Sequence, residues 1–219
     1  MMRQKLFRFH EIATRPNILE EGKALFDKIK GNWNNSFFEN NQDLVLELGC
    51  GRGEYTISLA KLNPHKNFIG IDVKGDRIWV GSSLALQQGL KNVAFLRTII
   101  HHLEDFFNPG EVSEIWITFP DPRPKGRDER RRLTCNRFLD MYLNILRPGG
   151  TLHLKTDNTD FFDYSLEGIK KHKVQNLQYT YDLYYSHLLP IHQGIKTNYE
   201  NIFTEKGEKI KYLSFNKIG

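Results

Sequence analysis

The sequence predicts an α/β fold, in which a mostly parallel β-sheet is covered by helices on both faces. Short apolar runs alternate with stretches of helical periodicity along most of the chain. This alternation is typical of parallel sheets, because each parallel connection has to cross back over the sheet, usually as a helix. The expected strands are residues 43–48, 67–72, 92–96, 113–119 and 151–155.

Helices are expected between these strands, and each has a recognisable end. The second ends at Gly89, and the third stops before Pro148 and two glycines. After the last parallel strand and its helix, residues 174–185 and 209–215 are expected to form an antiparallel closing pair. The expected helices are residues 54–62, 76–89, 130–146 and 161–171.

The domain organisation predicted from length and composition is simple. The 219 residues suit one domain, residues 42–219, preceded by an N-terminal helix and basic arm over residues 1–41. No apolar run approaches 18 residues, and the N-terminus lacks a signal peptide's apolar core, so no membrane association and a cytoplasmic location are expected. The two cysteines are interpreted as reduced thiols. Composition leaves a monomer and a homodimer equally open.

Basic residues cluster in two places, although the net charge is only +5. Residues 121–132 hold six cations against three acidic residues, and residues 1–15 hold four against one. A solvated charged face is one interpretation. A nucleic-acid contact is the other, and it is favoured because the first run adjoins an expected active-site loop. The cations are Arg123, Lys125, Arg127, Arg130, Arg131 and Arg132 in the first run, and Arg3, Lys5, Arg8 and Arg15 in the second.

A glycine-rich loop after the first strand indicates a nucleoside-binding turn. Gly49, Gly51 and Gly53 follow the spacing G-x-G-x-G, whereas a dinucleotide fingerprint needs its third glycine at position 54, which is Glu54. The loop also lacks the Lys-Ser/Thr pair of a P-loop. A tight turn without a ligand is the alternative, but acidic residues on two consecutive strands favour a ligand.

These acidic residues have distinct expected roles. Asp72, at the end of the second strand, is placed to accept hydrogen bonds from both hydroxyls of a ribose, and Glu47 can face a cationic amino-acid group. The loops that follow the parallel strands are expected to share one crevice, as in other open α/β sheets. The segment resembles the nucleoside-binding half of the Rossmann-like class I methyltransferases, which implies S-adenosylmethionine as the ligand.

The most informative stretch follows the fourth strand and reads Phe-Pro-Asp-Pro-Arg-Pro-Lys-Gly-Arg over residues 119–127. Its prolines fix the backbone and remove amide donors, so that Asp121 and Lys125 are held at the mouth of the strand. A rigid turn with a solvated aspartate is the alternative. The position next to the expected cofactor favours a role in the site.

This loop, with Arg131-Arg132-Leu133, residues 155–158 (Lys-Thr-Asp-Asn) and residues 197–200 (Thr-Asn-Tyr-Glu), resembles the bacterial tRNA (guanine-N(7)-)-methyltransferases. The resemblance covers residues 47–207. It implies transfer of a methyl group from S-adenosylmethionine to N-7 of a guanosine in the tRNA variable loop. The sequence departs from the family at two positions. Arg123 stands where the family usually has tryptophan. The family also usually has an acidic residue after the third strand, and the aligned position in this sequence is near Ile99.

The resemblance implies a role for each matching residue. Asp121 is expected to be catalytic and to lie near the cofactor. Thr98 and Ile99 are expected to hold the adenine through backbone groups and apolar contact. The expected cofactor-binding residues are Glu47, Gly49, Gly51, Gly53, Asp72, Thr98, Ile99 and Asp121. The expected substrate-binding residues are Arg123, Lys125, Arg131, Arg132, Asp157, Thr197, Asn198, Tyr199 and Glu200.

Simpler interpretations stay open for part of this set. Asp157 could cap the helix that follows it, and Thr197 with Glu200 has the spacing of a capping box. The expected chemistry needs neither a metal nor a strong base, because guanine N-7 carries a lone pair and no proton, and the eight histidines show no zinc spacing. The alternatives for function are a methyltransferase acting on a protein or small molecule, and a tRNA-binding relative without catalysis.

Overall fold

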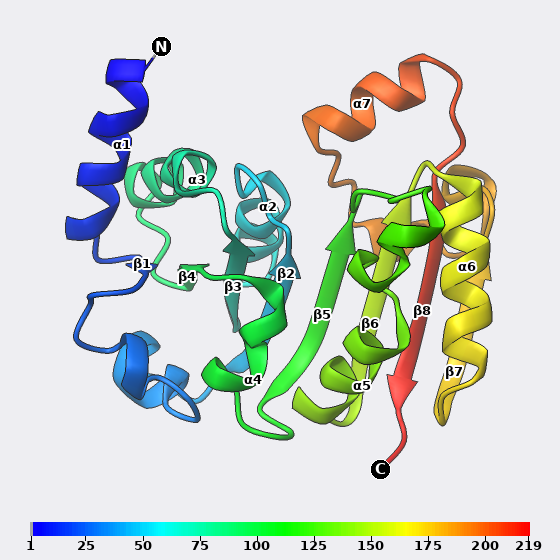
Figure 1. Ribbon diagram of the computed structural model, residues 1–219, viewed down its shortest axis with the longest axis horizontal. Coiled ribbons are helices and arrows are strands. Elements are labelled where there is room, and N and C mark those ends of the chain that lie inside the picture. The colour runs from blue at the N-terminus through cyan, green and yellow to red at the C-terminus, as the bar shows by residue number, and fades with distance from the viewer. Residues whose placement is uncertain (1) are drawn as a thin grey trace. The chain divides into compact units, whose positions relative to one another are not determined.

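The computed structural model describes residues 2–219, with side chains from Leu6 onward. Arg3 and Lys5, two of the expected basic-arm residues, lie outside the residues whose side chains are described. The chain divides into two compact units, Met1–Val112 and Ser113–Gly219, called unit 1 and unit 2 below. Figure 1 labels the elements of both units.

Unit 1 contains an all-parallel sheet in the order β1-β4-β3-β2. Along β2 and β3 the register is continuous, from Asp43 opposite Lys66 to Leu48 opposite Ile71. The three longer strands agree with the expected ones to within one residue, whereas the two-residue strand β1 was not expected. The strands are β1 (Ile18–Leu19), β2 (Asp43–Leu48), β3 (Lys66–Asp72) and β4 (Val93–Arg97).

The helices of unit 1 connect these strands. Three short turns of 3-10 or π helix supplement them, at Phe26–Lys28, Trp33–Phe38 and Ile100–His102. The strands are buried over nearly their whole length, which is why they appear as apolar runs rather than as alternating patterns. The helices are α1 (Met2–Thr14), α2 (Glu54–Leu62), α3 (Gly75–Gln87) and α4 (Leu103–Phe106).

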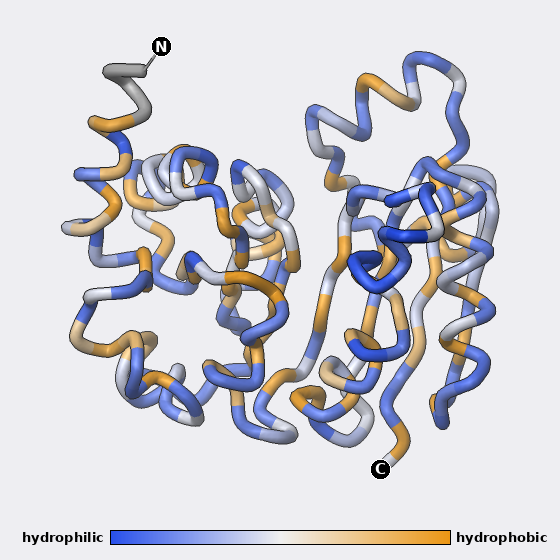
Figure 2. Tube along the Cα trace, viewed as in Figure 1, coloured by the Kyte–Doolittle hydropathy of each residue, from blue (hydrophilic) through white to orange (hydrophobic). Residues whose placement is uncertain are grey.

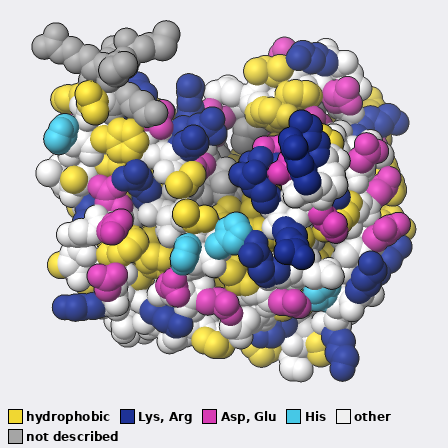
Figure 3. Space-filling view, viewed as in Figure 1, with side chains coloured by type: hydrophobic (Ala, Val, Ile, Leu, Met, Phe, Trp, Pro, Cys, Tyr) yellow, Lys and Arg dark blue, Asp and Glu magenta, His cyan; other side chains and the backbone are white. Residues whose placement is uncertain are grey.

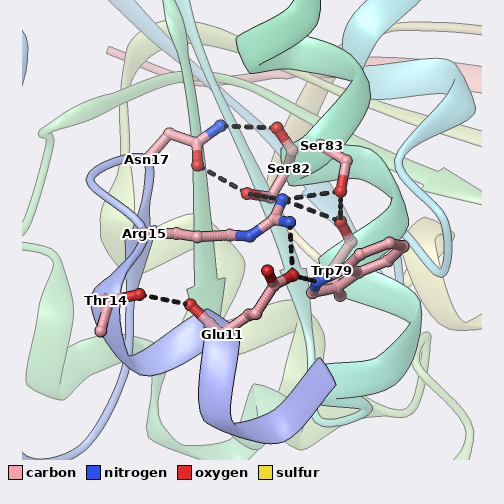
Figure 4. A network of polar contacts seen from close by, with 7 residues as sticks. All are labelled: Glu11, Thr14, Arg15, Asn17, Trp79, Ser82 and Ser83. Atoms are coloured by element: carbon pink, nitrogen blue, oxygen red, sulfur yellow. Dashed lines mark hydrogen bonds and ion pairs between the residues drawn. The ribbon is translucent and has the colours of Figure 1, made fainter. Parts of the chain in front are cut away.

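The N-terminal helix α1 docks on α3 through a polar network around Trp79 (Figure 4). The guanidinium groups of Arg8 and Arg15 lie 4.7 and 4.8 Å from the Trp79 ring centroid. The indole N–H donates to Glu11, whose carboxylate also pairs with Arg15 at 3.0 Å. Arg8 and Arg15, two of the cations expected in a basic arm, therefore pack against Trp79 of α3 by cation–π contact.

Unit 2 contains a sheet in the order β5-β6-β8-β7, in which β8 runs antiparallel to both of its neighbours. A parallel sheet with helices and an antiparallel closing strand was expected, and this fold class is confirmed. The elements are β5 (Val112–Thr118), a 3-10 segment (Gly126–Arg131), α5 (Asn136–Ile145), β6 (Leu146–Thr156), α6 (Thr159–Lys170), β7 (Val174–Thr180), α7 (Asn198–Glu205) and β8 (Lys211–Lys217).

Several boundaries in unit 2 differ from the expected ones, and the strand expected over residues 174–185 ends already at Thr180. The helix expected over residues 130–146 begins only at Asn136, because the preceding charged residues form the 3-10 segment (Figure 2, where this segment is strongly hydrophilic). Strand β6 starts at Leu146, directly after α5, and includes the Pro-Gly-Gly sequence that was expected to be a connection. Further short 3-10 turns lie at Leu183–Tyr185 and Leu189–His192.

Candidate functional site

The glycine turn after β2 has the backbone that its sequence predicts. Gly49, Gly51 and Gly53 have φ angles of 74°, 55° and 71°, a region that residues with a side chain rarely adopt. The N–H groups of Gly49 and Cys50 both donate to the carbonyl of Ile71, at 2.8 and 3.0 Å. The turn is therefore fastened to the end of β3, the strand that carries Asp72.

The three glycines differ in what surrounds them. A Cβ atom on Gly49 or Gly51 would meet nothing within 4 Å, so both leave open space beside the turn. A Cβ atom on Gly53 would lie 2.6 Å from the Phe95 ring and 3.4 Å from Gly81 of α3. The first two glycines thus leave room for a ligand, whereas the third allows α2 and α3 to pack closely.

Asp72 holds the turn and still offers acceptor positions. Its Oδ2 accepts the Gly51 N–H at 2.9 Å, and its Oδ1 accepts the Lys74 N–H at 2.8 Å. A carboxylate has about four acceptor positions, so further donors can approach both oxygens. Such a group can bind paired hydroxyls while its orientation is fixed by the backbone.

Glu47 is buried and lies against the first turn of α2. Its Oε2 accepts the Thr56 N–H at 2.8 Å and also accepts from the Thr56 hydroxyl. Burial, together with the negative charges of Glu47 and Asp72, raises the pKa of the neighbouring Cys50 thiol well above its usual range. The same concentration of negative charge beside the open glycines favours a cationic ligand.

Apolar side chains are exposed where β3 and β4 end. Val73 is 50% exposed and Ile99 is 51% exposed. Both line a cavity of about 260 Å³, below the usual range for a complete drug-sized ligand but suited to one flat ring. Thr98 and Ile99 line this cavity, and so does Val73, which the sequence analysis did not select. The cavity is lined by Glu20, Glu21, Phe26, Val73, Arg97, Thr98, Ile99 and His102.

In unit 2, Asp121 lies on an exposed loop and is held by Arg123. The Asp121 side chain is 62% exposed, and its Oδ2 lies 3.0 Å from Arg123 Nε. The Arg123 N–H also approaches Asp121 Oδ1 at 3.3 Å. Phe119 and Arg123 both have a φ of 48°, which is unusual for residues other than glycine and marks a tightly constrained loop. Arg123 therefore orients the aspartate that the sequence identified.

Two other arginines of the basic run are already engaged. Arg132 Nε donates to the Arg123 carbonyl at 3.1 Å, and the Arg132 guanidinium lies 4.3 Å from the Tyr164 ring centroid. Arg131 pairs with Asp128 at 3.4 Å on the surface. Lys125 is exposed. Figure 3 shows Lys and Arg side chains gathered over the segment between β5 and α5. Arg132 is thus a support of the Asp121 loop, and this surface remains basic.

A second cavity, of about 450 Å³, lies beside this basic surface, at the start of α5. The cations that line it are different from Arg123, Arg131 and Arg132, which make the contacts described above. Its charged lining residues are Arg130, Arg137 and Lys171, with Glu129 and Glu167 opposite in charge. The cavity therefore brings three cations and two acidic residues together at the surface of unit 2.

The structure contains only one of the two helix caps that the sequence suggested at Asp157 and at Thr197. The cap of α6 is Asn158, whose Oδ1 accepts the Phe161 N–H at 2.8 Å, so the interpretation of Asp157 as a cap is wrong. Burial raises the pKa of Asp157 above its usual range. Thr197 caps α7 by accepting the Glu200 N–H at 3.1 Å, which is the first half of the expected capping box. The Glu200 carboxylate contacts Lys155 instead of completing the box.

Glu200 makes contacts that the sequence did not indicate. It is completely buried and pairs with Lys155 at 2.8 Å. His192, interpreted from sequence as a surface or packing residue, is buried and lies 3.3 Å from the same carboxylate. A lysine beside the apolar residues Leu152 and Leu154 of strand β6 is the signal that could have indicated a buried partner.

Neither a metal cluster nor a membrane-crossing helix is found in the described part of the chain. Among residues 2–219, no three or more histidine, cysteine, aspartate or glutamate side chains come together in a way that could hold a metal ion. In the same residues, no helix has the length and apolar character needed to cross a membrane.

Comparisons with known proteins match most of the chain to methyltransferases. A family model described as "Putative methyltransferase" matches residues 41–213. The chain is 45% identical to a tRNA (guanine-N(7)-)-methyltransferase of Cytophaga hutchinsonii over 217 residues, covering 98% of both chains. It is 44% identical to a protein of the same name from Bacteroides thetaiotaomicron, covering 98% of this chain and 86% of the relative.

Solved structures of other methyltransferases share the fold. The chain is similar to the 16S rRNA methyltransferase KamB, with a TM-score of 0.63 and 14% identity, covering 92% of this chain and 96% of that one. It is also similar to an antibiotic-related methyltransferase, with a TM-score of 0.61 and 14% identity, covering 83% and 90%. At such low identity the likeness shows the fold alone.

Proposed function

Because the chain belongs to the tRNA (guanine-N(7)-)-methyltransferase family, we propose that it transfers a methyl group from S-adenosylmethionine to N-7 of a guanosine in tRNA. The observation that carries this proposal is the 45% identity to such an enzyme over 98% of both chains. The guanosine of the variable loop is the target that the resemblance of the sequence implies. The described residues supply the chemistry that this reaction needs.

The residues of unit 1 fit S-adenosylmethionine. Gly49 and Gly51 leave open space beside the turn, and Asp72 has acceptor positions for the ribose hydroxyls. Val73 and Ile99 offer apolar surface to the adenine. The negative charge around Cys50 favours the cationic end of the ligand. When bound, the cofactor supplies an activated methyl group on a sulfonium sulfur.

Asp121 is proposed to act through its charge. Guanine N-7 has a lone pair and no proton, so the protein need not remove one before the methyl group is transferred. The purine becomes cationic as N-7 is methylated, and its N-1 proton becomes more acidic. A carboxylate beside the base is then stabilising, and this contribution grows toward the transition state. Arg123, which pairs with Asp121, would fix the direction of this carboxylate.

The basic surface of unit 2 supports a polyanionic substrate. Lys125 and the cations around the second cavity provide charges that can meet phosphates, and phosphate contacts commonly dominate the affinity for nucleic acids. Tyr199, with 44% of its surface exposed, provides a ring on which a base can stack. A methyltransferase for a small molecule would need neither feature.

The experiment that tests this proposal is nucleoside analysis of tRNA incubated with the protein and methyl-labelled S-adenosylmethionine. We expect the label in 7-methylguanosine, and we expect it to disappear when the variable-loop guanosine of the transcript is replaced by adenosine. Label in another nucleoside would contradict the reaction. Binding of tRNA without any transfer of label would identify a non-catalytic relative.

A further inference from the structure

Helix α7 is attached to unit 2 in an unusual way. Of its eight residues, all of which the structure describes, Glu200 alone is buried. Its apolar side chains Tyr199 and Ile202 are 44% and 50% exposed. A surface helix usually docks through an apolar stripe. In Figure 1, α7 lies beyond the end of the sheet where β5 and β6 finish. A buried carboxylate therefore provides the main attachment of this helix.

Glu200 is held by three side chains that surround its carboxylate. Lys155 Nζ lies 2.8 Å from each carboxylate oxygen, and both side chains are 0% exposed. Tyr184 donates its hydroxyl hydrogen to Oε1 at 2.8 Å, and His192 Nε2 lies 3.3 Å from the same oxygen. Three of these contacts are made to Oε1 and one to Oε2. The carboxylate is completely buried among these partners, so that it presents no surface to a substrate.

The electrostatics of the cluster agree with a fixed ion pair. Burial by itself raises the pKa of Glu200, but the contacts with His192 and Lys155 outweigh it, so that the pKa lies below its usual range. Withdrawing two charges from water is costly, and replacing such a pair by neutral groups is often no less stable. Positioning of a neighbouring element is therefore a better explanation of the pair than stability.

The element that the pair positions is the start of the Asp121 loop. The Lys155 carbonyl accepts the Phe119 N–H at 2.8 Å, and Lys155 Nζ lies 5.7 Å from the Phe119 ring centroid. The Phe119 ring lies 5.2 Å from the Tyr199 ring, which stacks on Phe203 at 4.4 Å. One lysine thus contacts both the helix that carries Tyr199 and the residue that begins the loop.

We propose that Lys155, Tyr184 and His192 are positioning residues that hold Glu200, so that Tyr199 and Phe119 present an aromatic surface to the guanine base. Glu200 itself does not contact the substrate. Tyr199 contacts the guanine base instead, because base–aromatic stacking needs only an exposed ring face. This inference rests on the proposed function, because it concerns the same substrate.

The test uses Lys155→Met, Glu200→Gln and the variant that combines them. Single-turnover methylation of tRNA is measured at saturating S-adenosylmethionine, together with hydrogen exchange of the amides of residues 198–205. Each single change leaves one buried charge without its partner, and roughly a tenfold or greater loss of rate is expected, with faster exchange in α7. The combined variant has no uncompensated charge, and the amide introduced by Glu200→Gln can still bond to Tyr184 and His192.

We expect the combined variant to recover most of the rate and the slow exchange of α7. Recovery is specific to positioning, because a carboxylate that binds guanine cannot be restored by removing Lys155. A combined variant with protected α7 amides but the low rate of Glu200→Gln would overturn the proposal, and so would full activity of both single variants. Where a single variant fails to fold, the combined variant alone decides. Asp140→Asn, on the exposed face of α5, is the matched control.

Tyr199 gives an independent measurement. Tyr199→Ala is expected to lower kcat/KM for tRNA roughly 5- to 150-fold, the range for loss of one stacked base. Tyr199→Phe keeps the ring and is expected to lose less. Equal losses for the two variants would contradict stacking. If the unmodified protein did not methylate tRNA, the proposed function would fail, whereas hydrogen exchange would still test whether Lys155 holds α7.

Discussion

Replacement of Asp72 by alanine is expected to loosen the glycine turn as well as weaken cofactor binding. The backbone N–H groups of Gly51 and Lys74 lose acceptors at 2.9 and 2.8 Å. An N–H group left without a partner costs about 1–3 kcal/mol, and the lower end applies here because water can reach this partly buried site. Leaving these two N–H groups without an acceptor is therefore expected to lower the free energy of unfolding by about 2 kcal/mol.

The effect of Asp72→Ala on cofactor affinity adds to this loss of stability. A lost acceptor for the ribose hydroxyls costs about 1–3 kcal/mol, which corresponds to roughly 5- to 150-fold in Kd. Calorimetric titration with S-adenosylmethionine measures the affinity, and urea unfolding without cofactor measures the stability. Asp43→Ala is the matched control, because Asp43 lies at the opposite end of β2, where it begins.

Two results would refute this reasoning. Unchanged affinity for S-adenosylmethionine in Asp72→Ala would show that the ligand does not use the end of β3. Calorimetric binding of NAD by the unmodified protein would show that the G-x-G-x-G spacing was misinterpreted. A loss of stability without a loss of affinity would restrict Asp72 to its contacts with Gly51 and Lys74.

Three further predictions concern unit 2. Asp121→Asn should lower the single-turnover rate by about 100-fold at saturation with little change in cofactor affinity; normal turnover with weak tRNA binding would make Asp121 a recognition residue. Arg131→Ala should flatten the dependence of log affinity on log salt by about 0.7–0.9, whereas Arg132→Ala, which frees the loop, should mainly lower the rate; equal slopes for Arg131→Ala and the unmodified protein would exclude a phosphate contact. Because burial raises the pKa of Asp157, folding stability should fall as pH rises from about 4 through the raised pKa. Asp157→Asn should therefore be the more stable protein at pH 7 but not at pH 3, and urea unfolding curves with no such pH dependence would contradict this.

Local chemistry explains what the sequence predicted well. The strand at residues 43–48 and the turn after it depend on adjacent apolar residues and on glycines that adopt positive φ angles. Thr197 and Glu200 are close in sequence, so the cap of α7 was visible as a spacing. In each case the residues that determine the feature are within a few positions of one another.

Long-range partners explain what the sequence did not reveal. Lys155 and Glu200 are 45 positions apart, and no local pattern indicates that they form a buried pair. The run of arginines gave no sign that Arg132 supports the Arg123 carbonyl, because that contact depends on how the loop folds back. The motif likewise gave Gly53 the same role as Gly49, whereas the neighbour that distinguishes it, Phe95, comes from another strand.

The most direct test of the central claim is methylation of a tRNA in which the variable-loop guanosine carries carbon in place of N-7. Such a 7-deazaguanosine keeps the Watson–Crick edge and the stacking surface but has no lone pair at the position where the methyl group is expected. We predict that the unmodified tRNA accepts one labelled methyl group, and that the 7-deaza tRNA binds with similar affinity but accepts none. Equal labelling of the two tRNAs would contradict the proposed reaction, because the methyl group would then be attached at another atom.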